Sequence, residues 1–208
     1  MGATAAGPRE GTSRGRSRRS ILGLRRVLLG LACAATAASF SGCFLKEEHE
    51  EGEALREGLA VRVGGIEYTV YITRELNPAL PDDRGYWQGE EAKPGFALYG
   101  VFLQACNRSD DHDDLDEDTY EATEDFVVID TQGNEYEPLE VDEENVFQYH
   151  AGPVEPGQCI PEVGSLAQQG PTAGAMLPFE LPLEAGENRP LELEIQAEGE
   201  EALVELDI

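Results

Sequence analysis

Few side chains in this sequence are suited to acid–base or nucleophilic catalysis. Such chemistry needs a group whose pKa lies near neutrality, most often histidine, or a lysine whose pKa is lowered by burial. From residue 59 onward the chain has two histidines, His112 and His150, and a single lysine, Lys93. The same stretch has no Gly-x-Ser-x-Gly or His-Glu-x-x-His motif and no glycine-rich phosphate loop. We therefore expect no enzyme, and a hydrolase that uses a carboxylate pair stays an alternative because acidic residues are abundant.

A run of carboxylates between residues 109 and 125 could bind a hard cation. Calcium takes about six to eight oxygen ligands. The spacing differs from the helix–loop–helix calcium motif, because Leu115 stands where that loop needs a glycine. We expect these carboxylates to be solvated, and a calcium site stays the alternative. Its ligands would be the aspartates of the run, Asp110, Asp111, Asp113, Asp114, Asp116 and Asp118.

The cysteines indicate an oxidising compartment. Cys33 and Cys43 lie near the N-terminus, so Cys106 and Cys159 are the thiols of the region expected to fold. Outside the cytoplasm such a pair tends to be oxidised, and a bridge that closes a loop of roughly 50 residues would contribute on the order of 4 kcal/mol. A zinc site is not expected, because the sequence has no closely spaced cysteine pair. We predict a structural disulfide.

The N-terminal residues have the pattern of an export signal. Arginines precede an apolar run from Val27 to Phe40, which is too short and too rich in alanine to span a bilayer comfortably. The next residues, Ser41-Gly42-Cys43, resemble a bacterial lipobox. We predict a signal peptide at residues 1–42 and a Cys43 thiol that carries a diacylglycerol, with palmitate among its acyl chains. The Arg18-Arg19 pair also resembles a twin-arginine signal, so general secretion and twin-arginine export both stay open.

The charge balance limits the choice of partners. The formal net charge of the chain is −27 at pH 7. Loss of residues 1–42 would remove many arginines and one acidic residue, Glu10, which deepens the acidic excess. Such an excess disfavours nucleic acid and other polyanions, because like charges repel. Cations and basic peptides remain as candidate partners. The other interpretation is that the acidic surface is simply solvated.

The sequence pattern changes at residue 59, from a charged stretch to alternating apolar and polar residues. Residues 43–58 are charged and have few large apolar side chains, so they bury too little surface to offset chain entropy, and we predict a flexible tether. From Leu59 onward apolar residues alternate with polar ones on both sides of Gly64-Gly65, which is typical of a β-hairpin. A second hairpin is predicted around Gly133, which is free to take a positive φ.

The remaining apolar segments complete an all-β pattern. Residues 96–107 are the most apolar stretch, which indicates a central strand covered on both faces. Alternation returns in residues 176–181, 191–195 and 203–208. With these short strands and no long amphipathic helix, the sequence predicts a two-sheet antiparallel β-sandwich over residues 59–208.

One loop of this sandwich carries adjacent aromatic residues. Tyr86 and Trp87 lie in the proline- and glycine-containing segment 77–95. They could form a platform for a sugar or a peptide at one end of the sandwich. The alternative is that Trp87 covers part of the core.

Three segments resemble a known family. Residues 95–109 read Gly-Phe-Ala-Leu-Tyr-Gly-Val-Phe-Leu-Gln-Ala-Cys-Asn-Arg-Ser, residues 125–136 read Asp-Phe-Val-Val-Ile-Asp-Thr-Gln-Gly-Asn-Glu-Tyr, and residues 177–182 read Leu-Pro-Phe-Glu-Leu-Pro. Their order is similar to the telokin-like, immunoglobulin-like domain of unknown function found in many Gram-positive lipoproteins. The resemblance implies an immunoglobulin-like sandwich outside the membrane, with no catalytic residues. The acidic insertion and the Cys106/Cys159 pair are not part of that family's pattern.

These observations favour a lipid-anchored binding module on the extracytoplasmic face of the cell membrane, held there by Cys43 and acting without catalysis or a cofactor. Its expected partner is a protein, a peptide or a wall polymer, and not nucleic acid. One alternative is a calcium-dependent structural or adhesive module that uses the acidic insertion 109–125. The other alternative is an extracytoplasmic hydrolase.

Overall fold

The computed structural model describes residues 53–109, 118–140 and 142–208 of the chain. The chain divides into two units, Met1–Glu48 and His49–Ile208, and all described residues belong to the second. The predicted signal peptide and Cys43 lie outside the described residues. Within the described ranges, no helix has the length and apolarity needed to cross a membrane.

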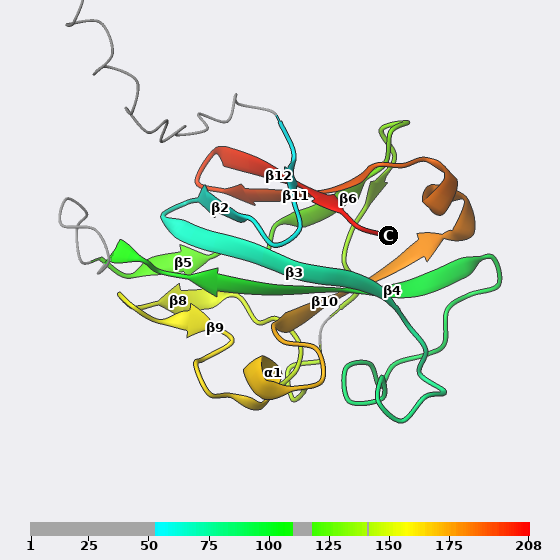
Figure 1. Ribbon diagram of the computed structural model, residues 1–208, viewed down its shortest axis with the longest axis horizontal. Coiled ribbons are helices and arrows are strands. Elements are labelled where there is room, and N and C mark those ends of the chain that lie inside the picture. Colours follow the sequence, from blue (N-terminus) through cyan, green and yellow to red (C-terminus); the bar gives the residue numbers. More distant parts are fainter. Residues whose placement is uncertain (1–52, 110–117, 141) are drawn as a thin grey trace, which may run out of the picture. The chain divides into compact units, whose positions relative to one another are not determined.

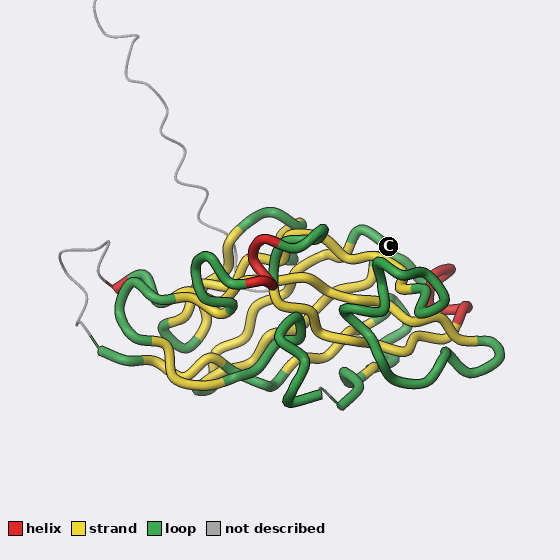
Figure 2. Tube along the Cα trace, turned by 90° about the horizontal axis from the view of Figure 1, so that it is seen from below, coloured by secondary structure: helices red, strands yellow, loops and turns green. Residues whose placement is uncertain are grey.

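The described residues form strands of two to eleven residues, with little helix (Figures 1 and 2). In chain order the strands are β1 (Leu55–Arg56), β2 (Ala60–Val63), β3 (Ile66–Leu76), β4 (Phe96–Cys106), β5 (Tyr120–Ala122), β6 (Phe126–Ile129), β7 (Glu135–Tyr136), β8 (Gly152–Val154), β9 (Cys159–Ile160), β10 (Ala175–Pro182), β11 (Leu191–Ala197) and β12 (Glu200–Leu206). The helical pieces are α1 (Leu166–Gln169) and the 3-10 turn η2 (Leu183–Glu187).

Two main sheets stack into a sandwich. The first has the strand order β1-β12-β11-β6-β7, and the second has the order β10-β4-β3-β2, with β9 paired to the end of β4. A small third sheet joins β5 and β8. Figure 1 shows β12, β11 and β6 above β3, β4 and β10. The predicted all-β sandwich is confirmed, with two differences: a small third sheet is present, and β1 pairs with β12 in parallel.

The first strand lies inside the range that the sequence assigns to the tether. Leu55 of β1 pairs with Val204 of β12, and its side chain packs against the sandwich core. The pairing with β12 and the packing of this apolar side chain together seat the strand on the sheet edge. The sandwich begins before Gly58, and residues 43–52 of the predicted tether lie outside the described residues.

Gly64 and Gly65 form the turn of the first hairpin, as predicted. The strands β2 and β3 pair as far as Val63 opposite Ile66. The two glycines have φ values of +56° and +80°, the left-handed region that a two-residue hairpin turn requires. A Cβ on Gly65 would also lie 2.4 Å from Cδ1 of Tyr120, so a side chain would collide with this ring.

The second main sheet is covered on both faces because alternate residues of β4 enter different apolar clusters. Val101 and Leu103 belong to the core between the sheets. Leu98 and Phe102, which point the other way along the pleat, pack in a second cluster with Tyr86. We call this second group the outer cluster; its buried members are Leu76, Tyr86, Leu98, Phe102 and Met176. Long loops cover it, which is why β4 is buried along most of its length.

The predicted disulfide is confirmed. Cys106 and Cys159 lie opposite each other in the pairing of β4 with β9, and their sulfur atoms are 2.05 Å apart. The next residue, Asn107, is fully buried, and its side-chain amide donates to the carbonyl oxygens of Asp118 and Val154 at 2.8 and 2.9 Å. The bridge and this asparagine together fix the two-residue strand β9 and the chain around it.

Candidate functional site

Residues 137–140 and 142–151, which we call the crossing segment, run from the first main sheet to the second. The strand β7 stops at Tyr136, shortly before Pro138, which has no N–H for a ladder hydrogen bond. Leu139 N donates to Pro178 O at 2.7 Å, and Tyr149 N donates to Met176 O at 2.9 Å. The crossing segment therefore lies along the edge of β10 that β4 leaves uncovered.

Carboxylates gather along β7, the crossing segment and η2, and we call this region the acidic edge. Two grooves follow one another here, and they are lined by six glutamates. Glu135, Glu184 and Glu187 line the first groove, and Glu124, Glu140 and Glu143 line the second. All six are exposed, and neither groove has a lysine or an arginine in its lining.

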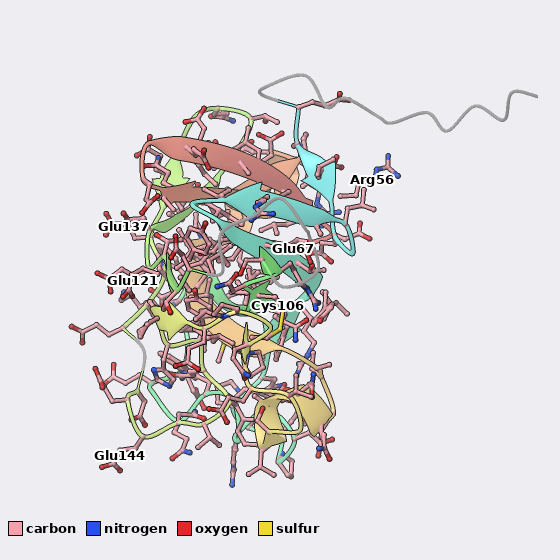
Figure 3. The ribbon with its side chains drawn as sticks, turned by 90° about the vertical axis from the view of Figure 1, so that its left-hand side faces the viewer. Arg56, Glu67, Cys106, Glu121, Glu137 and Glu144 are labelled. Atoms are coloured by element: carbon pink, nitrogen blue, oxygen red, sulfur yellow. A yellow bond between two sulfur atoms is a disulfide. The ribbon has the colours of Figure 1, made fainter. Side chains whose placement is uncertain are left out.

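Figure 3 shows the distribution of nearby carboxylates. Glu121, Glu137 and Glu144 lie along one margin of the sandwich in this view, and Arg56 lies on the opposite margin. These glutamates are exposed too. The negative charge therefore extends beyond the lining of the grooves.

The first groove is polar and open, with a volume of about 920 Å³. Asp130, which is buried, joins its two walls. The carboxylate accepts the backbone N–H groups of Gln132 and Asn134, both at 2.9 Å. It also accepts hydrogen bonds from the side chains of Asn134, Asn188 and Tyr136 at 2.8, 3.1 and 3.2 Å. Asn188 directly follows η2, so this one carboxylate connects the β6–β7 turn to η2.

These hydrogen bonds determine the ionisation of Asp130. Burial is the largest single influence and alone would raise the pKa of the carboxyl group. The hydrogen bonds from Asn134, Asn188 and Gln132 together outweigh burial and hold the pKa of Asp130 well below its ordinary value. Burial and the neighbouring Asp130 charge raise the pKa of Tyr136. Asp130 is therefore a buried structural carboxylate that holds lining residues of the groove in place.

The second groove combines carboxylates with an apolar surface, in a volume of about 490 Å³. Its apolar lining includes Pro138, Leu139 and Leu177. His150 is half-buried, and its Nε2 lies 3.1 Å from the carbonyl oxygen of Asn145. Tyr149 donates its hydroxyl to Thr123 O at 2.9 Å, and burial raises its pKa. Polar and apolar groups thus line the same small groove.

The structure separates the two aromatic residues of the predicted platform. Tyr86 is only 2% exposed, because its ring packs edge-on against Phe102 and Phe147 at centroid distances of 5.0 and 5.2 Å. Tyr86 is therefore a core residue, and its predicted role as a ligand platform is wrong. Trp87 is half-buried and packs against the outer cluster.

Little of the predicted calcium site is described. Asp110, Asp111, Asp113, Asp114 and Asp116 lie outside the described residues. Asp118 is described, and its main-chain carbonyl oxygen accepts a hydrogen bond from the side-chain amide of Asn107. Within the described ranges, no group of three histidine, cysteine, aspartate or glutamate side chains is placed to hold a metal ion. The calcium site stays a prediction.

Sequence reasoning did not find the acidic edge. Its glutamates come from three separate stretches, around residue 124, at 135–143 and at 184–187. Of these six glutamates, only Glu124 lies in the dense acidic run at residues 109–125. The Asp142-Glu143-Glu144 triplet was an available local signal, but only the path of the crossing segment brings the stretches together.

The chain is similar to solved structures at low sequence identity. No family model and no curated protein matches the chain. The yjhA protein of Bacillus subtilis is 13% identical with a TM-score of 0.44, over 74% of this chain and 99% of that one. An uncharacterised β-sandwich protein of Clostridium difficile 630 is 11% identical with a TM-score of 0.42, over 76% and 97%. The candidate lipoprotein ycdA of Bacillus subtilis is 8% identical with a TM-score of 0.42, over 71% and 38%. The family resemblance of the sequence stays a prediction.

Proposed function

We propose that this chain is a lipid-anchored binding module on the extracytoplasmic face of the membrane, and that its acidic edge binds a basic segment of a partner protein or peptide without catalysis. The lining of the two grooves carries the proposal, because it has six exposed carboxylates and neither lysine nor arginine. Within the described residues, none of these six side chains has a hydrogen bond or an ion pair of its own. They are free to meet a partner's positive charges.

The second groove suits the shape and chemistry of a lysine or arginine side chain. These side chains have an apolar stem and a charged end. The stem would lie on Leu139 and Leu177, and the charged end would meet the carboxylates of Glu140 and Glu143, which line the same groove. Opposite charge would also speed the encounter and favour basic partners over acidic ones.

The proposed location is supported by the cysteines. The Cys106–Cys159 disulfide suits an oxidising compartment. Acyl chains on Cys43 would each contribute about 0.8 kcal/mol per buried methylene, so two or three chains would hold the protein at the membrane. The sandwich would then present its grooves to partners outside the cytoplasm.

Binding of a fluorescent peptide of alternating lysine and serine, followed by anisotropy, tests this function. We expect saturable binding to the chain, weakened about tenfold or more by the triple reversal E124K/E140K/E143K, because each change replaces an attraction by a repulsion. The matched control is E75K/E201K/D207K, which makes the same charge change at exposed positions outside the grooves. An equal loss in both triples would show that net charge, and not the grooves, drives binding.

A further inference from the structure

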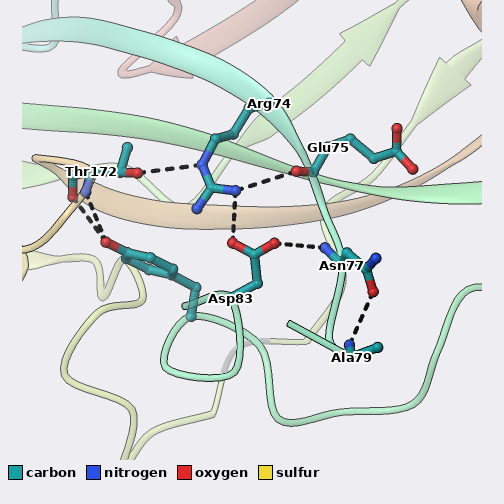
Figure 4. Close-up of polar contacts among 7 residues, drawn as sticks. Arg74, Glu75, Asn77, Ala79, Asp83 and Thr172 are labelled. Carbon is teal, nitrogen blue, oxygen red and sulfur yellow. Dashed lines mark hydrogen bonds and ion pairs between the residues drawn. The ribbon is translucent and has the colours of Figure 1, made fainter. Parts of the chain in front are cut away.

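The loop between β3 and β4, residues 77–95, is fixed to the sandwich by a buried carboxylate. Asp83 Oδ1 lies 2.8 Å from Arg74 Nη1, and Asp83 Oδ2 accepts the backbone N–H of Asn77 at 2.8 Å (Figure 4). The Arg74 guanidinium also lies over the rings of Tyr86 and Phe102, at 5.5 and 5.2 Å. Arg74 therefore holds the loop through its ion pair with Asp83 and its contact with the Tyr86 ring.

Tyr86 supplies a second anchor for the same loop. Its hydroxyl accepts the backbone N–H of Thr172 at 2.9 Å, and its carbonyl oxygen accepts the side-chain amides of Asn145 and Gln148, both at 3.1 Å. The loop is thus pre-organised before any ligand arrives, which lowers the entropy cost of binding.

A small pocket lies on this loop, with a volume of about 320 Å³. Its lining is Pro78, Arg84, Trp87, Gln88 and Gly89. The indole Nε1 of Trp87 donates to Glu90 O at 2.8 Å, so the ring is held in one orientation and offers its surface rather than its N–H. A Cβ on Gly89 would lie 2.4 Å from Trp87 Cζ2, so only glycine leaves the ring in place.

We propose that this pocket binds a sugar ring of a glycan, a function separate from that of the acidic edge. A pyranose has apolar C–H faces and a rim of hydroxyl groups. Trp87 and Pro78 supply flat apolar surfaces, and Arg84 and Gln88 supply hydrogen-bond donors. Arg84 Nε donates to Pro78 O at 3.1 Å, which orients the guanidinium and leaves its terminal N–H groups for hydroxyl oxygens.

The size and charge of the pocket favour a sugar over a basic segment. Pockets for small molecules measure roughly 300–1,000 Å³, and this one is at the small end of that range, which suits a single ring. Its charged lining residue is the cation Arg84, so the lining has no carboxylate to pair with a lysine or an arginine. A proline-rich peptide, which could also lie on Trp87, is the competing occupant.

Fluorescence of the full chain tests the proposal directly, because Trp87 is the only tryptophan in the sequence. The probes are triacetylchitotriose, maltotriose and a proline-rich peptide. We expect at least one trisaccharide to give a saturable change in emission and to reduce quenching by acrylamide. No response to either trisaccharide, or a response to the peptide alone, would overturn the proposal.

Two double variants, both of which keep Trp87, test whether the sugar that changes the fluorescence binds in this pocket. R84A/Q88A should raise the sugar Kd about tenfold or more, because a charged and a neutral donor are lost. The matched control is R189A/Q158A, since Arg189 Nε also donates to a backbone carbonyl, that of Gly186 at 3.0 Å. All four positions are exposed, so both variants should fold. An equal loss of affinity in both would overturn the assignment to this pocket.

Discussion

At the residue scale, Asp130 is a carboxylate whose ionisation is tied to the fold. Its folded pKa is held below its ordinary value by hydrogen bonds from Asn134, Asn188 and Gln132, which outweigh burial. A lowered folded pKa means that the carboxylate stabilises the fold above its unfolded pKa, about 3.9. This stabilisation is lost as the pH falls toward the folded pKa.

We therefore predict that Asp130→Asn lowers the unfolding midpoint at pH 7, and that the gap between parent and variant closes as the pH falls below about 4. Thermal unfolding monitored by circular dichroism across this range measures the gap. Asp82→Asn, at an exposed aspartate with no side-chain hydrogen bond in the described structure, is the control. A gap that stays constant from pH 7 to pH 2 would contradict the account.

Arg74 gives a second prediction at this scale. Its partner Asp83 has a side chain only 8% exposed, whereas the Arg74 side chain is 27% exposed. Arg74→Ala would remove the cation partner of the buried Asp83 carboxylate, and we expect a loss of about 2–3 kcal/mol in the free energy of unfolding, less than for a fully buried pair. Arg74→Lys should lose part of this, because an ammonium keeps the charge without the planar ring contacts.

Urea unfolding measures both Arg74 variants. The control is Arg62→Ala, at an exposed arginine whose guanidinium donates to Gly65 O at 3.3 Å. That change should cost no more than about 1 kcal/mol. Equal losses at Arg74 and Arg62 would mean that burial of Asp83 does not matter.

At the element scale, β9 has two residues and depends on the disulfide for its place beside β4. The bridge spans 53 residues, and a loop of this size corresponds to a stabilisation of about 4 kcal/mol. We predict a loss of this order in the free energy of unfolding of Cys106→Ala/Cys159→Ala, measured by denaturant titration. A loss below about 1 kcal/mol would show that the bridge restrains little of the unfolded chain.

The strands of this fold could be predicted because their signals are local. Gly64-Gly65 between alternating runs defines one hairpin, and residues 176–181, 191–195 and 203–208 lie within or overlap β10, β11 and β12. The burial of Tyr86 could not be predicted this way. Its loop has the composition of a surface segment, and only the partners Arg74 and Phe102, distant in sequence, draw its ring into the outer cluster.

The acidic edge, like the burial of Tyr86, could not be predicted from local sequence signals. Its carboxylates have no common local pattern, because Glu124, Glu140 and Glu184 belong to different connections between strands. They come together because the crossing segment pairs along β10 through Leu139 and Tyr149. The sequence could therefore predict that the surface is negatively charged, but not that these carboxylates gather at the acidic edge.

At the scale of the whole molecule, the net charge of −27 sets the response to ions. We predict that calcium, magnesium and added salt raise the thermal midpoint in the same manner, through screening of a solvated acidic surface. A rise that saturates with calcium alone, and that disappears when Asp110 to Asp118 are deleted, would instead support a specific calcium site through ligand linkage.

The proposed attachment to the membrane gives another prediction at this scale. Cys43→Ala should move the chain from the membrane fraction to the soluble fraction, because the proposed acyl chains would provide most of the binding free energy. Fractionation followed by immunoblotting measures this, with Cys33→Ala as the matched control, since Cys33 lies within the predicted signal peptide. Membrane association that survives Cys43→Ala would contradict lipidation at this residue.

The central claim is that the acidic edge binds a basic segment. Amide hydrogen exchange of the full chain, with and without the lysine–serine peptide, tests it most directly because it locates the contact on the fold. We predict added protection at β7, the crossing segment and η2, with little change at β2 and β12. Protection spread evenly over the sandwich, or confined to other elements, would contradict the claim.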